Sequence, residues 1–192
     1  MKRALDLAVA VPLLVILSPV LVALAAAVRL TSRGPAFHRA TRVGRDGRPF
    51  TMLKLRTMRA GPGAAITTRD DPRVTALGRA LRRARLDELP QLLNVLRGDM
   101  SIVGPRPEAP RFVALYTAEQ RAVLALRPGI TGAAQLAFRD EAALIDPRDP
   151  EGSYARAVLP RKLAIDLDYV RRRSLALDLA IMARTVAALR RA

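Results

Sequence analysis

The sequence contains no cysteine, only three lysines and few aromatic residues. Without cysteine the chain can form neither a disulfide nor a thiolate metal site, and the redox state of its compartment leaves no trace in the sequence. Aromatic residues make up 4% of the chain and tryptophan is absent, so the stacking platforms on which single-stranded nucleic acids bind are scarce. The composition therefore excludes disulfide-stabilised folds and weakens an interpretation as a single-strand binder.

Acidic residues are also few, at 17 against 33 basic residues, which gives a formal net charge of +16 over 192 residues. The length predicts about one domain with a buried core. The charge favours polyanionic partners such as nucleic acid, nucleotides or an anionic membrane surface, and does not choose among them. Biased codon usage explains the surface arginines as well as a need for guanidinium chemistry does. The only lysines are Lys2, Lys54 and Lys162.

One long apolar run, residues 7–28, contains no charged residue. A helix of this length reaches about 33 Å, enough to cross the hydrocarbon core of a bilayer. A secretory signal peptide normally has an apolar region of only about 7 to 15 residues, so this run is too long for one. A spanning helix and a re-entrant hairpin both remain open on these grounds.

Two features of the run favour the hairpin. Ser18 and Pro19 lie near its middle, and proline removes a backbone donor and kinks or breaks a helix. Basic residues flank both ends, and the positive-inside rule places basic flanks in the cytoplasm, which only a hairpin allows for both. From the residues alone the spanning and re-entrant alternatives are about equally favoured.

The polar remainder of the chain predicts a mainly helical domain with a minor β hairpin. Asp46 and Gly47 form a turn signal ahead of an extended apolar piece at residues 50–55. Thr75 fits the N-cap of a helix that runs to about Arg83. Near the C-terminus, apolar residues at helical spacing precede and follow an arginine cluster, which indicates an interfacial helix, with an ordinary core helix as the alternative. The residues concerned are Leu163, Leu167, Val170, Leu177 and Ile181, with Arg171, Arg172 and Arg173.

Two adjacent carboxylates, Asp87 and Glu88, follow the predicted helix. Asp87 fits the N-cap of a further helix that ends at Gly98, and on local grounds a cap is a better interpretation than catalysis. The neighbouring residues in the sequence favour a catalytic role instead. Arginines precede the pair, and the stretch "SIVGPRPEAP" after it holds Arg106 in a stiff turn between prolines, where a guanidinium suits a bidentate phosphate contact.

Positive surroundings should keep both carboxylates ionised. An ionised carboxylate beside a bound phosphate can hold Mg²⁺ or attack phosphorus as a nucleophile. The residues therefore suggest phosphate chemistry at this pair of acids.

Several long stretches resemble, in the same order, the bacterial sugar transferase family, the monotopic polyprenyl-phosphate phosphoglycosyl transferases, in their short single-domain form. These stretches are "KRALDLAVAVPLLVILSPVLVALA", "RVGRDGRPFTMLKLRTM", "DPRVTALGRALRRARLDELPQLLNVLRGDMSIVGPRP", "RPGITG" and "LDYVRRRSLALDLAIMARTV". The resemblance implies an enzyme that moves a sugar 1-phosphate from a UDP-sugar to undecaprenyl phosphate and releases UMP. This reaction is the first membrane step in the synthesis of a surface glycan.

The resemblance also implies roles for individual residues. Asp87 and Glu88 match the catalytic pair of the family, with Asp87 as the nucleophile of a ping-pong mechanism and as the residue at Mg²⁺. Glu88 is expected to orient Asp87 or to assist the lipid phosphate. Three basic residues match basic positions of the family and are expected to contact the diphosphate. Arg56 is a weaker, fourth candidate that the spacing suggests, because residues two apart on a strand share a face and Arg56 lies two positions beyond Lys54. The four candidates are Lys54, Arg56, Arg82 and Arg106.

The family's membrane helix is broken at a Ser-Pro pair, which here is Ser18 and Pro19. The expected architecture is therefore a re-entrant helix-break-helix over residues 1–30, followed by a small cytoplasmic catalytic domain with amphipathic membrane-surface helices over residues 31–192. The expected location is the inner membrane with the site facing the cytoplasm. The expected partners are a UDP-sugar, undecaprenyl phosphate and the cytoplasmic leaflet of the bilayer, with no nucleic acid, and a second copy or downstream glycosyltransferases as protein partners.

Three positions depart from the family pattern, namely Ala40, Arg85 and Ala133, and none of them removes a catalytic group. The single histidine, His38, is interpreted as structural. A basic membrane-anchored nucleic-acid binder or a membrane scaffold remains the alternative function, and salt-dependent binding to arbitrary DNA would distinguish the former. The identity of the sugar is not readable from the sequence.

Overall fold

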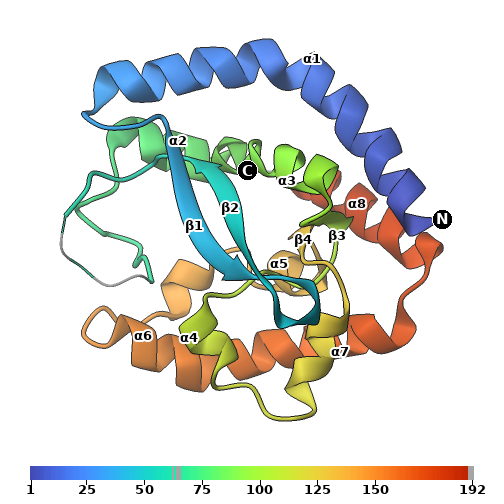
Figure 1. Ribbon diagram of the computed structural model, residues 1–192. Coiled ribbons are helices and arrows are strands. Elements are labelled where there is room, and N and C mark those ends of the chain that lie inside the picture. The colour runs from blue at the N-terminus through green and yellow to red at the C-terminus, as the bar shows by residue number, and fades with distance from the viewer. Residues whose placement is uncertain (62, 64–65, 190–192) are drawn as a thin grey trace.

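The computed structural model of the protein describes residues 1–61, 63 and 66–189 (Figure 1). Its helices are α1 (Lys2–Thr31), α2 (Ala76–Arg83), α3 (Gln91–Arg97), α4 (Pro110–Val113), α5 (Ala133–Ala137), α6 (Pro150–Ser153), α7 (Leu159–Arg172) and α8 (Leu175–Leu189). Its strands are β1 (Phe37–Val43), β2 (Pro49–Leu55), β3 (Ser101–Val103) and β4 (Gly129–Thr131). The catalytic domain expected over residues 31–192 ends in residues 190–192, which lie outside the described residues.

The strands form two separate sheets. β1 and β2 make the antiparallel hairpin that the sequence predicts, and Asp46 and Gly47 lie in its turn with φ of 58° and 75°. β3 and β4 pair in parallel, with Ser101 opposite Gly129 and Val103 opposite Thr131. No sequence pattern indicated this second sheet, because strands of three residues are too short to show an alternation of apolar and polar side chains. The prediction of a mainly helical fold with a small hairpin is confirmed.

Helix α1 arches over α2 and α3 as one continuous, curved helix (Figure 1). Pro19 has no N–H to donate to the carbonyl of Val15, its partner four residues back. The hydroxyl of Ser18 donates to that same carbonyl at 2.9 Å. The predicted interruption at Ser18 and Pro19 is therefore wrong as secondary structure, because the serine replaces the donor that proline removes and the helix bends without ending.

The N-terminal end of α1 is attached to the globular part of the molecule. Asp6 is buried and accepts hydrogen bonds from the hydroxyl of Ser101 at 2.8 Å and the backbone N–H of Ile102 at 3.0 Å. Arg3 donates to the carbonyls of Val95 and Leu96 at 2.6 and 2.9 Å, at the C-terminal end of α3, where a cation is favoured by the helix dipole. The first turns of the apolar helix are thus held by charged contacts to α3 and β3.

The C-terminal end of α1 is attached to the same globular unit through Arg56, just after β2. Its guanidinium donates to the carbonyls of Val28 and Ser32 at 3.3 and 2.6 Å. Between the two attachments, large apolar side chains such as Ile16 and Val22 are 70% and 69% exposed. α1 is the one helix among the described residues that is long and apolar enough to cross a membrane.

Helix α7 lies along the opposite side of the molecule from α1 and is a core helix (Figure 1). Leu163 and Leu167 pack in one hydrophobic cluster with Tyr154 and Phe112. The interpretation of this apolar stripe as a membrane-interface helix is therefore wrong for α7, because the stripe is covered by protein. In α8, Ile181 is buried, whereas Leu179, Val186 and Leu189 are about half exposed.

The buried amide of Asn94 fixes α3 to the edge of β2. Its Oδ1 accepts from the N–H of Leu53 at 3.0 Å and its Nδ2 donates to the carbonyl of Thr51 at 2.8 Å. These are the hydrogen bonds that a neighbouring strand would make. Since α3 follows the two carboxylates and β2 carries Lys54, this amide sets how closely the two approach.

Replacing Asn94 with alanine should lower the free energy of unfolding by about 2–4 kcal/mol, because two backbone groups lose their partner in a buried site. Thermal unfolding of the protein in lipid nanodiscs would measure the change. The matched control is Gln91→Ala, because Gln91 is a buried amide one turn earlier on α3 whose Nε2 has no hydrogen-bond partner. Equal losses for the two variants would contradict the role assigned to Asn94.

Candidate active site

Asp87 and Glu88 lie in a single 3₁₀ turn, Leu86–Glu88, between α2 and α3. Arg85 precedes it in the left-handed conformation, with φ of 58°, and reverses the chain after α2. α3 begins only at Gln91, with Pro90 in the N-cap position. The prediction that Asp87 caps this helix is therefore wrong, because the tight turn takes up both acidic residues before α3 begins. The predictions of Thr75 as the N-cap of α2 and of Gly98 at the end of α3 are confirmed.

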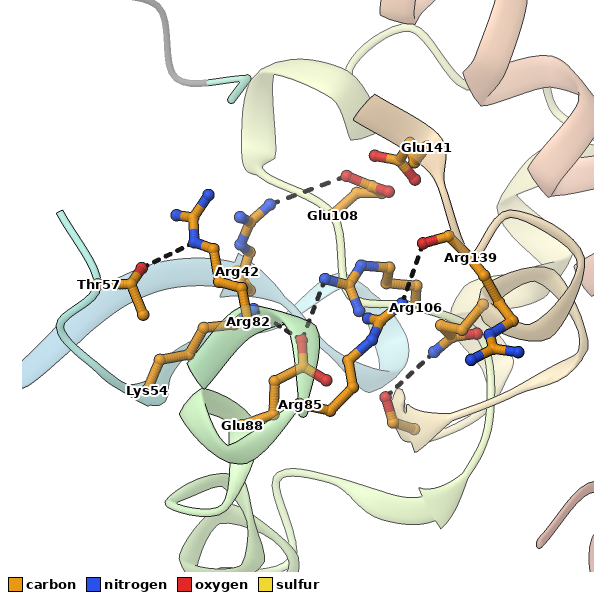
Figure 2. A network of polar contacts seen from close by, with 12 residues as sticks. Arg42, Lys54, Thr57, Arg82, Arg85, Glu88, Arg106, Glu108, Arg139 and Glu141 are labelled. Atoms are coloured by element: carbon orange, nitrogen blue, oxygen red, sulfur yellow. Dashed lines mark hydrogen bonds and ion pairs between the residues drawn. The ribbon is translucent and has the colours of Figure 1, made fainter. Parts of the chain in front are cut away.

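Glu88 is buried and is the centre of an ion cluster (Figure 2). Its Oε1 lies 2.9 Å from Lys54 Nζ and 3.4 Å from a terminal nitrogen of Arg106. Burial opposes ionisation, but the positive charges of Lys54 and Arg106 outweigh it and hold the pKa of Glu88 well below its ordinary value. The carboxylate thus joins three segments that are distant in the sequence: β2, the 3₁₀ turn and the turn after β3.

Asp87 is equally buried, yet its carboxylate has no hydrogen bond or ion pair to any residue that the structure describes. Burial raises the pKa of Asp87, and the charge of Glu88 adds to the effect, while Lys54, Arg82 and Arg106 oppose it. We expected positive surroundings to keep both carboxylates ionised; they lower the pKa of Glu88, whereas burial shifts the pKa of Asp87 in the other direction. Of the two adjacent acids, Glu88 is paired with two cations, whereas the carboxylate of Asp87 is available to a ligand.

A wide cleft of about 1840 Å³ opens at the two acids. Its volume exceeds the range of about 300–1,000 Å³ that is typical of small-molecule sites, so it has room for a large ligand or for two. Arg82, on α2, lines the cleft and donates from Nε to the hydroxyl of Thr57 at 2.8 Å (Figure 2). Lys54 and Arg106 line it as well, so that three of the four predicted diphosphate contacts converge on the acids.

Arg56 also borders the cleft, but its guanidinium is engaged by the end of α1 through Val28 and Ser32. The hypothesis that Arg56 and Lys54 point to one anion was based on a shared strand face. In the structure Lys54 contacts Glu88, whereas the guanidinium of Arg56 donates to Val28 and Ser32, so the two side chains have different partners. The structure therefore gives Arg56 the role of joining α1 to the hairpin.

The turn that carries Arg106 is set by close contact between two backbones. A Cβ atom on Gly129 would lie 2.1 Å from the nitrogen of Gly104, so neither strand end could carry a larger residue without moving apart. The N–H of Gly129 donates to the carbonyl of Pro105 at 2.9 Å. The "GPRP" and "RPGITG" stretches therefore meet, and together they present Arg106 to Glu88.

A second buried carboxylate, Glu108, lies two residues after Arg106 and contacts Tyr154 and Lys162. It borders the cleft, and no sequence pattern pointed to it. The sequence signal that could have led to Glu108 is its partner Lys162, because this chain has only three lysines and uses arginine at nearly all other basic positions.

No group of three or more acidic or histidine side chains able to hold a metal ion occurs in the part of the chain that the structure describes. Mg²⁺ does not need such a cage, because it keeps several waters and is usually bound by one or two carboxylates together with substrate phosphates. The unpartnered carboxylate of Asp87 in a cleft with room for a phosphate ligand fits that mode of binding. His38 also borders the cleft, and burial together with the charges of Lys54 and Arg42 lowers its pKa.

Comparison with known proteins shows matches along the whole chain. A family model described as bacterial sugar transferase matches residues 1–192. A UDP-glucose:undecaprenyl-phosphate glucose-1-phosphate transferase of Caulobacter vibrioides is 46% identical over 98% of this chain and 69% of that protein. A protein with the same name from Escherichia coli is 39% identical over 97% of this chain, which spans only 39% of its length. The uncharacterized sugar transferase EpsL of Bacillus subtilis is 39% identical over 97% of this chain and 85% of its own.

Replacing Lys54 with methionine should lower the free energy of unfolding by about 1–3 kcal/mol. This is less than the roughly 3–5 kcal/mol for breaking a fully buried pair, because Arg106 still faces Glu88. The double variant Lys54→Met/Glu88→Gln should lose less than the sum of the two single variants. Thermal unfolding in nanodiscs measures all three.

The matched control for this cycle is Arg171→Met. It breaks an ion pair of 2.6 Å with Glu119 whose side chains are 67% and 69% exposed, and should cost less than about 1 kcal/mol. Strictly additive losses at Lys54 and Glu88 would show that the two side chains do not interact.

Proposed function

The chain belongs to the bacterial sugar transferase family, and on that premise we propose that it transfers a sugar 1-phosphate from a UDP-sugar to undecaprenyl phosphate with release of UMP. The names of the Caulobacter and Escherichia relatives make UDP-glucose the first donor to test. The reaction would supply the first lipid-linked intermediate of a surface glycan. In this proposal the globular part over residues 31–192 is the catalytic unit.

The observation that carries the proposal is the contrast between the two adjacent acids. Glu88 is neutralised by Lys54 and Arg106, whereas Asp87 is buried, faces the cleft and has no partner among the described side chains. An acid that served only the fold would be paired, since a buried carboxylate without a partner is destabilising. A nucleophile, in contrast, must keep its oxygen atoms free for the substrate.

In the first half of the reaction, a carboxylate oxygen of Asp87 attacks the phosphorus that bears the sugar. The new O–P bond forms as the bond from that phosphorus to the bridging oxygen of UMP breaks, and the electron pair leaves with UMP. In the second half, a phosphate oxygen of the lipid attacks the same phosphorus, and the electron pair of the O–P bond returns to Asp87. No proton transfer is needed in either half, so the mechanism is ping-pong with Asp87 regenerated.

Each basic residue at the cleft has a role that follows from its place. Arg82 and Arg106 are suited to the oxygen atoms of the diphosphate, because guanidinium groups match phosphate geometry and stay charged. Lys54 holds Glu88 and adds positive charge beside the reacting phosphorus. Mg²⁺, held by Asp87 and the substrate phosphates, would offset the negative charge that develops on the leaving UMP.

The proposal includes a re-entrant α1 with the site on the cytoplasmic face of the inner membrane, where UDP-sugars are available. Its support is that one globular unit holds both ends of α1, at Asp6 and Arg3 on one side and at Arg56 on the other. A helix that crossed the bilayer would have its ends on opposite faces, about 30 Å of hydrocarbon apart. The exposed apolar surface lies on the arch between the two attachments.

Asp87→Asn should abolish UMP release from UDP-glucose, because an amide oxygen is a poor nucleophile and forms no stable acyl phosphate equivalent. The assay uses purified protein in nanodiscs with Mg²⁺, undecaprenyl phosphate and a panel of UDP-sugars. Asp46→Asn is the matched control, since Asp46 is an exposed carboxylate in the hairpin turn, and it should retain wild-type turnover. Full activity of Asp87→Asn would rule out the covalent mechanism.

The pH profile should report the environment of Asp87. Because burial raises the pKa of this carboxyl, kcat/KM for the UDP-sugar should fall as the pH drops through a value above that of an ordinary aspartate. The donor is a diphosphate diester without a titrating proton in this range, so the acid limb belongs to the protein. In Glu88→Gln the limb should move to lower pH, because the charge of Glu88 is one of the causes that raise the pKa of Asp87. A shift to higher pH would contradict this assignment.

A further inference from the structure

We propose that Lys162, on α7, is a positioning residue for Arg106: by neutralising Glu108, it leaves Arg106 free to pair with Glu88 at the cleft. The inference rests on the proposed function, since Arg106 is there assigned to the donor diphosphate. Lys162 lies 75 positions after Asp87 in the sequence and would not touch the reacting atoms.

The ammonium group of Lys162 is buried and donates three hydrogen bonds. Its Nζ lies 3.1 Å from Glu108 Oε1, 2.8 Å from Glu141 Oε2 and 2.8 Å from the hydroxyl of Tyr154. Tyr154 in turn donates to the same oxygen of Glu108 at 2.5 Å. The side chains of Lys162 and Glu108 are only 3% and 8% exposed. The three donors of the ammonium group therefore each have an acceptor, and one of these acceptors is Glu108.

The position of Glu108 makes its neutralisation necessary. Arg106 and Glu108 are separated by Pro107 alone, and the negative charges of Glu88, Glu141 and Glu108 raise the pKa of Arg106 despite its burial. The second cation at Glu108 is Arg42, at the longer distance of 3.8 Å (Figure 2). Without Lys162, Glu108 would keep only the hydrogen bond from Tyr154 and the longer contact to Arg42, and we expect Arg106, two residues away in the chain, to shift toward this buried carboxylate.

A second charged residue of α7 lies near the backbone of the same turn. Asp166, one turn after Lys162, is buried, and burial raises its pKa to about 7, while Lys162 and the backbone N–H groups of Arg106 and Ala134 act in the opposite direction. α7 thus holds the side chain of Glu108 through Lys162 and places the buried carboxyl of Asp166 near the backbone of Arg106. This geometry explains why α7 is a core helix that nonetheless borders the cleft at Lys162.

A lysine suits this place better than an arginine. An ammonium group has three donors that diverge from one atom, and here they reach a carboxylate on the turn, a carboxylate at residue 141 and a phenol hydroxyl. A planar guanidinium presents its donors in one plane and is larger, so it could not satisfy all three acceptors in a buried site. Lys162→Arg should therefore behave as a disruptive change.

The test is a double-mutant cycle on the full-length protein in nanodiscs. Lys162→Met should lower kcat/KM for UDP-glucose by about tenfold to a hundredfold, the scale expected when a positioned group moves by about 1 Å. The double variant Glu108→Gln/Lys162→Met, which removes both charges, should recover to within about threefold of the wild type. Adding Lys162→Met to Arg106→Met should cause no further loss, because the first acts through the second.

A second measurement needs no substrate. Amide hydrogen exchange of the segment 101–109 should be about tenfold faster in Lys162→Met and in Tyr154→Phe than in the wild type. The matched control is Tyr169→Phe, which removes an equivalent buried bond of 2.6 Å to Asp178 at the other end of α7 and should leave this segment unchanged.

Losses that simply add in the Arg106 cycle, or unchanged exchange in residues 101–109, would overturn the positioning role. A wild-type protein that releases no UMP from any UDP-sugar would instead refute the proposed function. In that case the exchange measurement still decides whether Lys162 holds the turn of Arg106.

Discussion

The buried charge of Glu88 is the constraint on which the rest of the structure depends. A carboxylate in this position is stable only if cations reach it, and it draws Lys54 from β2 and Arg106 from the turn after β3. Those two contacts require the hairpin, the 3₁₀ turn and the β3–β4 pair to meet at one point. Asn94 sets the distance between α3 and β2, and Gly104 and Gly129 allow the last turn to approach. The neighbouring Asp87 is left without a partner as a result of this arrangement.

The three lysines share one environment. Lys2 pairs with Asp178 at 2.6 Å, Lys54 with Glu88, and Lys162 with Glu108 and Glu141, and in each case at least one carboxylate partner is buried. Every other basic residue of the chain is arginine. A compact ammonium is favoured where a buried acceptor site is small and not planar. In this arginine-rich chain, lysine therefore marks the ion pairs that connect the N-terminal end of α1, the cleft and α7.

Sequence signals predicted correctly those features that depend only on residues close together in the chain. The turn at Asp46 and Gly47, the N-cap at Thr75 and the end of α3 at Gly98 each depend on a few neighbouring residues, and the structure confirms all of them. The signals failed where a distant group decides the outcome. The cap expected at Asp87 is replaced by a 3₁₀ turn after Arg85. Arg56 donates to the end of α1 and Lys54 to Glu88, and the apolar stripe on α7 packs against Tyr154.

The sequence by itself determined which chemistry the chain can carry. Its adjacent acids, its arginines, its apolar N-terminal run and its ordered motifs are properties of residue type and spacing, and they identify the family without coordinates. Only the tertiary structure decided that Glu88 and Asp87 differ, that both ends of α1 join one globular unit, and that Lys162 acts on the turn of Arg106. These features depend on burial and on contacts between residues far apart in the chain, and the energy of a charge is set by what surrounds it in space.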